Sequence, residues 1–221
     1  FINLGFKVSV QSDAGISSSY YDNDYKRSGA EVVKSEKTLL SNADLIFAIV
    51  RPDIKLLKLF KKGSILICQM ETYINSNELK DIAKLGITCF ALEQVPRISR
   101  AQSMDVLSSQ SNLAGYRAVI EASQIYRKAF PMMMTAAGTI PPARVLVMGA
   151  GVAGLQAIAT AKRMGAIVSA TDVRPAAKEQ VESLGGKFVA VEDEEFKKAE
   201  SSGGYAKQMS AAYQKKQAEL V

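Results

Sequence analysis

The segment 144–174 constrains the fold more than any other part of this 221-residue chain. It begins with RVLVM, a short apolar run typical of a buried strand, and continues as G-x-G-x-x-G at Gly149, Gly151 and Gly154. A run rich in Ala and Leu then predicts a helix over 152–164, and AIVSAT predicts a second strand. Strand, glycine loop, helix and strand in this order predict a parallel α/β unit.

The three glycines have separate roles in holding a pyrophosphate. The first permits a tight turn, the second lets a phosphate approach the backbone, and the third lets the helix pack closely on the sheet. The helix start adds free N–H groups and the positive end of its dipole. Asp172 follows about twenty residues later, where a carboxylate can accept hydrogen bonds from both ribose hydroxyls. The unit therefore predicts a dinucleotide site, and the alternative is a glycine-rich strand–helix turn without a ligand.

The residues around Asp172 bear on which dinucleotide binds. A carboxylate at this position favours NAD, because it would repel the 2′-phosphate of NADP. Arg174 leaves two interpretations open. Its guanidinium can accommodate a 2′-phosphate, or it can stack on the adenine.

In the first ninety residues, apolar runs typical of strands alternate with segments of helical periodicity. Apolar runs typical of short buried strands occupy 6–10, 44–50, 64–70 and 87–92. Helical candidates lie between them, at 18–28, 37–42, 54–60 and 77–85. The predicted fold class is therefore α/β, with two Rossmann-like domains built on parallel sheets that are covered on both faces.

We expect a domain boundary at residue 112. Residues 1–112 form an N-terminal α/β domain, and residues 113–221 form a linker helix and an NAD-binding Rossmann domain. We expect both domains to be incomplete, the first without its first strand and the second without its second half. In 113–130, apolar residues at helical spacing predict the linker helix, and a turn-rich connector follows over 132–143.

The run RISRAQSMDVLSSQSNLAGY, residues 97–116, is unusually polar. It contains five serines, two arginines and two glutamines, and the whole chain contains no histidine. An acid–base site is therefore a poor interpretation of this run. The alternative is structural, with the serines as helix caps and turns.

Composition excludes several classes of function. The net charge is +6, but the basic residues occur singly or in short clusters, which argues against a nucleic-acid partner. The two cysteines, Cys68 and Cys89, lie in apolar strand-like runs, so we expect buried reduced thiols, no metal site and a reducing compartment. The longest apolar runs hold about seven residues, whereas a membrane-spanning helix needs about twenty.

Several longer stretches resemble one family. RISRAQSMDVLSSQSNLAGYRAVIEA, FPMMMTAAGTIPPARVLVMGAGVAGLQAIATAKRMGA, TDVRPAAKEQVESLGGKF and GGYAKQMS resemble the NAD(H)-binding first domain of the alpha subunit of proton-translocating NAD(P) transhydrogenases. The resemblance is nearly continuous from about residue 96 to residue 221 and looser before it. The alanine dehydrogenases are the broader relatives.

The resemblance implies a Re/Si-specific reaction in which hydride passes directly from NADH on this domain to NADP⁺ on a partner domain. The transfer would be coupled to proton translocation through a membrane domain. The NADP-binding and membrane parts would lie on other segments or on a beta subunit, and the first domains would pair as a homodimer. The chain would lie peripherally at the cytoplasmic or mitochondrial-matrix face of the membrane.

The resemblance also assigns site residues. It places the nicotinamide and its ribose near Arg97, Gln102, Asp105 and Ser108, with Gly204 and Tyr205 in a mobile loop that closes over the nucleotide. The residues that it places along the dinucleotide are Arg97, Ile98, Ser99, Arg100, Gln102, Gly149, Ala150, Gly151, Val152, Gly154, Asp172, Val173, Arg174 and Gly204. The residue chemistry agrees, because hydride transfer breaks no O–H or N–H bond and needs two rings held in contact. Gln102 can bind a carboxamide, and Arg97 can pair with Asp105, although such a pair can also be purely structural.

Two alternatives stay open. An alanine dehydrogenase is expected to use a His and a Lys in its N-terminal domain, whereas the matching strand end here reads Gln69, Met70 and Glu71. The second alternative is a non-catalytic fragment of a split or decayed gene. Because both domains are expected to be incomplete, we expect the chain by itself to bind NAD weakly or not at all and to be inactive.

Overall fold

The computed structural model describes residues 1–73, 76–96, 98–199 and 207–221. The chain forms two compact units, Phe1–Asp105 and Val106–Val221. The division falls immediately before the long helix α5 (Val106–Ile125), so the whole of α5 belongs to the second unit. The expected boundary at residue 112 lies inside this helix.

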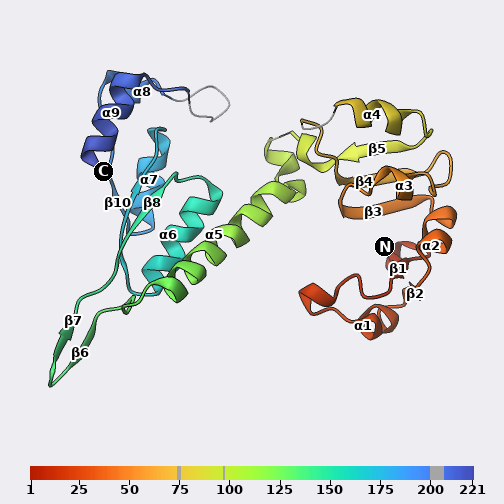
Figure 1. Ribbon diagram of the computed structural model, residues 1–221, viewed down its shortest axis with the longest axis horizontal. Coiled ribbons are helices and arrows are strands. Elements are labelled where there is room, and N and C mark those ends of the chain that lie inside the picture. Colours follow the sequence, from red (N-terminus) through yellow and green to blue (C-terminus); the bar gives the residue numbers. More distant parts are fainter. Residues whose placement is uncertain (74–75, 97, 200–206) are drawn as a thin grey trace. The chain divides into compact units, whose positions relative to one another are not determined.

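The first unit alternates short strands and helices (Figure 1). Its strands are β1 (Ser9–Gln11), β2 (Glu31–Val33), β3 (Leu45–Val50), β4 (Ile65–Gln69) and β5 (Thr88–Ala91). Its α-helices are α1 (Asp22–Arg27), α2 (Glu36–Asn42), α3 (Ile54–Leu57) and α4 (Ser76–Ala83). Short 3-10 helices cover Ile2–Leu4, Ile16–Ser18, Leu92–Gln94 and Ser99–Met104.

Strands β3, β4 and β5 form a parallel sheet in that order, as the apolar runs predict. One face of this sheet carries the core of the unit, in which Leu66 and Cys68 are fully buried. Cys68 and Cys89 are free thiols, the first buried and the second partly buried. Strands β1 and β2 form a separate parallel pair.

The opposite face of the β3–β5 sheet carries a row of large apolar side chains. The register places Phe47, Ile67 and Phe90 side by side across the three strands. Phe47 is 54% exposed and Phe90 is 56% exposed. The sequence predicts that both faces of the sheet are covered. In the described residues, this face of the β3–β5 sheet is partly exposed instead.

The second unit is built on a parallel sheet with the order β10-β9-β8. Its strands are β8 (Arg144–Met148), β9 (Ile167–Thr171) and the two-residue β10 (Lys187–Phe188). Its helices after α5 are α6 (Val152–Arg163), α7 (Ala176–Ser183), α8 (Glu194–Lys197) and α9 (Ala211–Leu220). The sequence predicts β8, α6 and β9, and the structure confirms all three.

Helix α6 buries Ile158 and Ala161 in the core of the second unit, against Val168 and Ala170 of β9. It ends at Arg163, and Gly165 two residues later has a φ of 87°, which glycine readily adopts, and an N–H that donates to the Lys162 carbonyl. Helix α5 packs against α6 at Gly115, where a Cβ would lie 2.0 Å from the Ala153 carbonyl oxygen. The start of α6 is therefore fixed both by the sheet and by α5.

The connector between α5 and β8 differs from the sequence prediction. Instead of an irregular turn-rich segment, it forms an antiparallel hairpin of β6 (Met133–Thr135) and β7 (Gly138–Ile140). All six strand residues of this hairpin are exposed.

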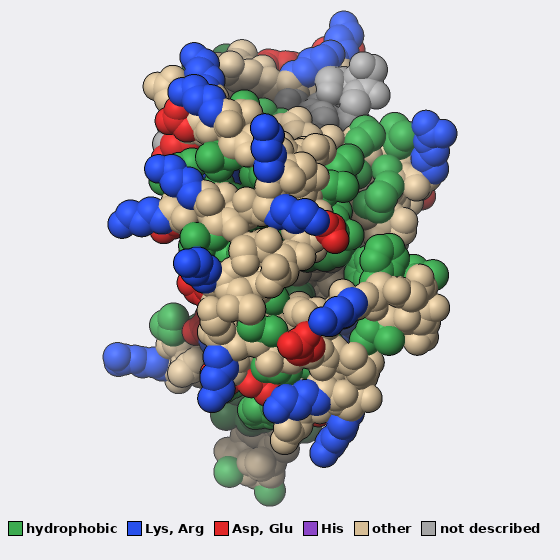
Figure 2. All heavy atoms as spheres, turned by 90° about the vertical axis from the view of Figure 1, so that its right-hand side faces the viewer, with side chains coloured by type: hydrophobic (Ala, Val, Ile, Leu, Met, Phe, Trp, Pro, Cys, Tyr) green, Lys and Arg blue, Asp and Glu red, His purple; other side chains and the backbone are tan. Residues whose placement is uncertain are grey.

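In the part of the chain that the structure describes, no helix is long and apolar enough to cross a membrane. On the face drawn in Figure 2, Lys and Arg side chains are scattered among polar and apolar side chains.

Candidate dinucleotide-binding site

The glycine loop lies at the carboxyl end of β8, where ligands bind in open parallel sheets. Gly149 makes the turn with a φ of 96°, in the region that favours glycine, and its N–H donates to the Thr171 carbonyl at 2.8 Å. A Cβ on Gly154 would lie 1.8 Å from the Gly149 carbonyl oxygen. The first and third glycines therefore have the roles that the motif predicts, a tight turn and close packing of the helix.

Gly151 is the N-cap of α6, and a Cβ built on it would meet nothing within 4 Å. The space beside its backbone is therefore open rather than filled by protein. The first N–H groups of any helix have no partner within the helix. Open space beside a glycine backbone at a helix start fits a pyrophosphate, which can approach these N–H groups closely.

Asp172 lies just beyond β9 and faces the glycine loop. Its Oδ2 accepts hydrogen bonds from Ala150 N at 2.8 Å and from Arg174 Nη2 at 3.0 Å. Its Oδ1 accepts from Arg174 N at 2.8 Å and from Arg174 Nε at 3.0 Å. The Asp172 side chain is 8% exposed and the Arg174 side chain is 24% exposed. One carboxylate thus links the glycine loop to the turn after β9.

Two opposing effects set the pKa of Asp172. Burial raises it, but the hydrogen bonds from the Arg174 side chain and from the backbone N–H groups of Arg174 and Ala150 lower it by more. The net pKa lies below the ordinary value of an aspartate. Asp172 is therefore ionised at neutral pH, as an acceptor of ribose hydroxyls must be.

The polar segment lies mainly in the first unit. Ile98 precedes the 3-10 helix Ser99–Met104, and Asp105 follows it with its N–H donating to the Gln102 carbonyl at 3.2 Å. The side chains of Ile98, Ser99, Arg100 and Gln102 are exposed, whereas the neighbouring Ala101 is buried.

Ser108 falls in the first turn of α5, in the second unit. Arg97, Gly204 and Tyr205 lie outside the described residues, so the pair of Arg97 with Asp105 and the closing loop stay predictions.

Gln217 of α9 is a residue that the sequence analysis missed. Its Nε2 donates to Thr171 Oγ1 at 2.9 Å, and its Oε1 accepts from Val191 N at 2.8 Å. The first of these bonds holds the side chain of Thr171, the last residue of β9, immediately before Asp172. No sequence signal marks this role, because the two partners are 46 residues apart.

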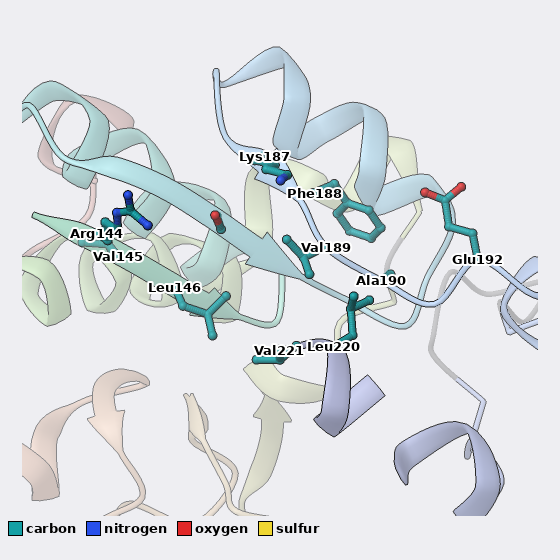
Figure 3. A pocket seen from close by; sticks show the side chains of 11 residues that line it. Arg144, Val145, Leu146, Lys187, Phe188, Val189, Ala190, Glu192, Leu220 and Val221 are labelled. Atoms are coloured by element: carbon teal, nitrogen blue, oxygen red, sulfur yellow. The ribbon is translucent and has the colours of Figure 1, made fainter. Parts of the chain in front are cut away.

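A cavity of about 490 Å³ lies elsewhere in the second unit. Figure 3 shows Leu146 of β8 and Val189 among the side chains that line it, together with Arg144 and Lys187, the first residues of β8 and β10. Among the described residues, its lining includes neither the glycine loop nor Asp172. The carboxyl edge of the sheet, rather than this cavity, carries the features of a dinucleotide site.

At the end of β4, where the sequence analysis expects the catalytic residues of an alanine dehydrogenase, hydrogen bonds and an ion pair join neighbouring segments of the chain. Glu93 accepts hydrogen bonds from Met70 N at 3.0 Å and Thr72 N at 3.1 Å. Arg51 donates from Nε to the Met70 carbonyl at 3.1 Å and pairs with Glu78 at 2.7 Å. These charged groups hold the backbone of the strand end, which is a structural role.

Comparison with known families agrees with both units. The N-terminal domain model of the alanine dehydrogenase/PNT family matches residues 1–114, and its C-terminal domain model matches residues 118–221. The chain belongs to this family. Its two matched regions together cover nearly the whole chain.

Individual relatives from the two branches of the family differ in their sequence identity to this chain. An NAD(P) transhydrogenase subunit alpha polypeptide from Rhodospirillum rubrum is 54% identical over all of this chain and 59% of its own length. A crystal structure of a transhydrogenase from Sinorhizobium meliloti superposes with a TM-score of 0.87 at 51% identity, over 99% of this chain and 58% of that one. An alanine dehydrogenase from Methanococcus maripaludis is 30% identical over 78% of this chain and 47% of its own length. The chain spans less than two thirds of each of these relatives.

Proposed function

We propose that this chain is the NAD(H)-binding part of a proton-translocating NAD(P) transhydrogenase. The observation that carries the proposal is the hydrogen bond from Ala150 N to Asp172 Oδ2 at 2.8 Å. It sets a backbone suited to a pyrophosphate beside a carboxylate suited to a ribose, at the carboxyl edge of a parallel sheet. The Asp172 charge favours NAD(H) over NADP(H), which would bind on a partner domain.

The proposed reaction is direct, Re/Si-specific hydride transfer from NADH to NADP⁺. Such a transfer requires two nicotinamide rings at near-attack distance and the exclusion of water, with no proton acceptor. We propose that Gln102, Asp105 and Ser108, with Arg97 and Tyr205, orient the NADH ring. The absence of histidine from the sequence supports this reaction over oxidative deamination of an amino acid, which needs a proton acceptor.

We further propose that the chain works in an assembly. The partners would be an NADP-binding domain and proton-translocating membrane domains, on further segments or on a beta subunit, and a second copy of this domain. It would lie peripherally, at the cytoplasmic or mitochondrial-matrix face of the membrane. The names of the relatives as subunits of NAD(P) transhydrogenases support this arrangement.

An isotope experiment tests the reaction. The natural polypeptide that carries this chain is combined with its NADP-binding partner, NADP⁺ and NADH deuterated at one C4 position. We expect mass spectrometry to find the deuterium in NADPH for one of the two C4 labels. NADPH that carries solvent hydrogen for both labels would refute direct transfer. Reduction of NAD⁺ that depends on added alanine would instead support an alanine dehydrogenase.

A further inference from the structure

The carboxylate of Asp172 has no acceptor position left for a ribose. An ionised carboxylate offers about four lone-pair positions, two on each oxygen. Oδ1 accepts from Arg174 N and Arg174 Nε, and Oδ2 accepts from Ala150 N and Arg174 Nη2. The four donors lie between 2.8 and 3.0 Å, so each of them is a well-formed hydrogen bond. The hydroxyls of a ribose therefore compete with donors of the protein itself.

Two of these donors are held by the fold. Ala150 N belongs to the glycine loop, whose preceding residue Gly149 is bonded to the Thr171 carbonyl at 2.8 Å. Arg174 N belongs to the turn that leads into α7, where Ala177 N donates to the Arg174 carbonyl at 3.1 Å. Moving either backbone group would break these further bonds.

The other two donors belong to the Arg174 side chain. Nε and Nη2 engage both carboxylate oxygens at once and can leave together by rotation of the side chain. The Arg174 side chain is 24% exposed and the Asp172 side chain is 8% exposed, so Arg174 is the more accessible member of the pair. A ligand that reaches Asp172 meets this guanidinium.

We propose that Arg174 is a latch on the dinucleotide site: its guanidinium fills the two positions on Asp172 that the ribose hydroxyls need, and it must swing away for the nucleotide to bind. This inference rests on the proposed NAD(H) site and adds to it a residue that sets the affinity. The ribose hydroxyls then replace Nε and Nη2, while the backbone bonds from Ala150 and Arg174 keep the carboxylate in place. No covalent bond changes in this exchange.

The latch lowers the apparent affinity by the fraction of molecules in which it is open. If about one molecule in ten is open, removal of the guanidinium lowers the Kd for NADH about tenfold. The matched control is Lys178→Ala, which removes an equal charge from α7, where Lys178 pairs with Glu192 at 2.6 Å. Removing a positive charge by itself weakens the binding of an anionic ligand such as NADH. This loss of affinity should therefore be common to both variants.

The experiment titrates NADH into the natural polypeptide that carries this chain, as wild type, Arg174→Ala and Lys178→Ala. We expect Arg174→Ala to bind NADH about tenfold more tightly than wild type, with Lys178→Ala unchanged or weaker. An unchanged or raised Kd for Arg174→Ala would overturn the latch, because the guanidinium would then be neutral or would hold the nucleotide. Absence of NADH binding by wild type would instead refute the proposed function.

A spectroscopic measurement covers the case in which Arg174→Ala does not fold. The Nε–H resonance of Arg174 in wild type is assigned by its disappearance in Arg174→Lys. We expect this resonance to be observed without NADH and to shift or exchange away when NADH saturates the site. A resonance that stays unchanged at saturation would show that Arg174 remains on Asp172 and would overturn the proposal.

Discussion

Gly154 shows how one missing methyl group positions a helix. A Cβ at this position would lie 1.8 Å from the Gly149 carbonyl oxygen, which is backbone and cannot rotate away. We expect Gly154→Ala to push α6 off the sheet and to lower the free energy of unfolding by about 1–3 kcal/mol. Urea unfolding measures this loss. Gly151→Ala is the matched control, because its Cβ would meet nothing within 4 Å, and equal losses in both variants would contradict the steric role of Gly154.

The charge on Asp172 gives a pH dependence. Because the hydrogen bonds from Arg174 and Ala150 hold its pKa below the ordinary value, ionised Asp172 stabilises the folded state above its unfolded pKa of about 3.9. This stability is lost as the pH falls through the folded pKa. We expect the stability advantage of wild type over Asp172→Asn to be constant near neutral pH and to shrink below about pH 4. Urea unfolding of both proteins down to about pH 2 measures it, and an advantage that does not change with pH would show that the carboxylate charge is not involved.

At the scale of elements, the crossing of α5 and α6 sets the position of the helix start that would face the phosphates. Gly115 allows this close approach, since its Cβ would lie 2.0 Å from the Ala153 carbonyl oxygen. We expect Gly115→Ala to separate the helices and to lower the free energy of unfolding by about 1–3 kcal/mol. Ala118→Ser, which adds one atom at an exposed position of the same helix, should stay within about 0.5 kcal/mol of wild type. If thermal or urea unfolding finds the two variants alike, the close crossing is not what fixes α6.

The elements also show which parts of the fold a sequence pattern can reveal. Strands β3, β4, β5, β8 and β9 are predicted because each is a short apolar run between turn residues. The beginning of α5 at Val106 is missed, because its first turns are rich in Ser, Gln and Asn and show no clear apolar periodicity. The hairpin β6–β7 is missed because glycine and proline suggest an irregular loop.

The candidate site also contains parts that the sequence predicts and parts that it does not. Fixed spacing predicts the glycine loop and Asp172, since each glycine has a steric reason for its position. Spacing carries no information on which donors fill the Asp172 carboxylate, so the bonds from Arg174 and Ala150 emerge only in three dimensions. The same holds for Gln217, whose partner Thr171 is distant in the sequence.

At the scale of the molecule, the residues that we propose to contact NADH are distributed over the two units of the chain. Gln102 and Asp105 belong to the first unit, and the glycine loop, Asp172 and Ser108 belong to the second. We propose that the adenosine and the pyrophosphate bind at the glycine loop and Asp172, and that the nicotinamide binds at the polar segment.

The decisive measurement for the dinucleotide site is an NADH titration of the natural polypeptide that carries this chain, as wild type and as Gly151→Ala. The variant places a methyl group in the open space beside the start of α6. We expect unchanged thermal stability and NADH binding weakened by at least about tenfold, a loss of about 1.4 kcal/mol. Equal NADH affinity in the two proteins, with both folded, would show that the glycine loop does not hold the nucleotide and would contradict the proposed function.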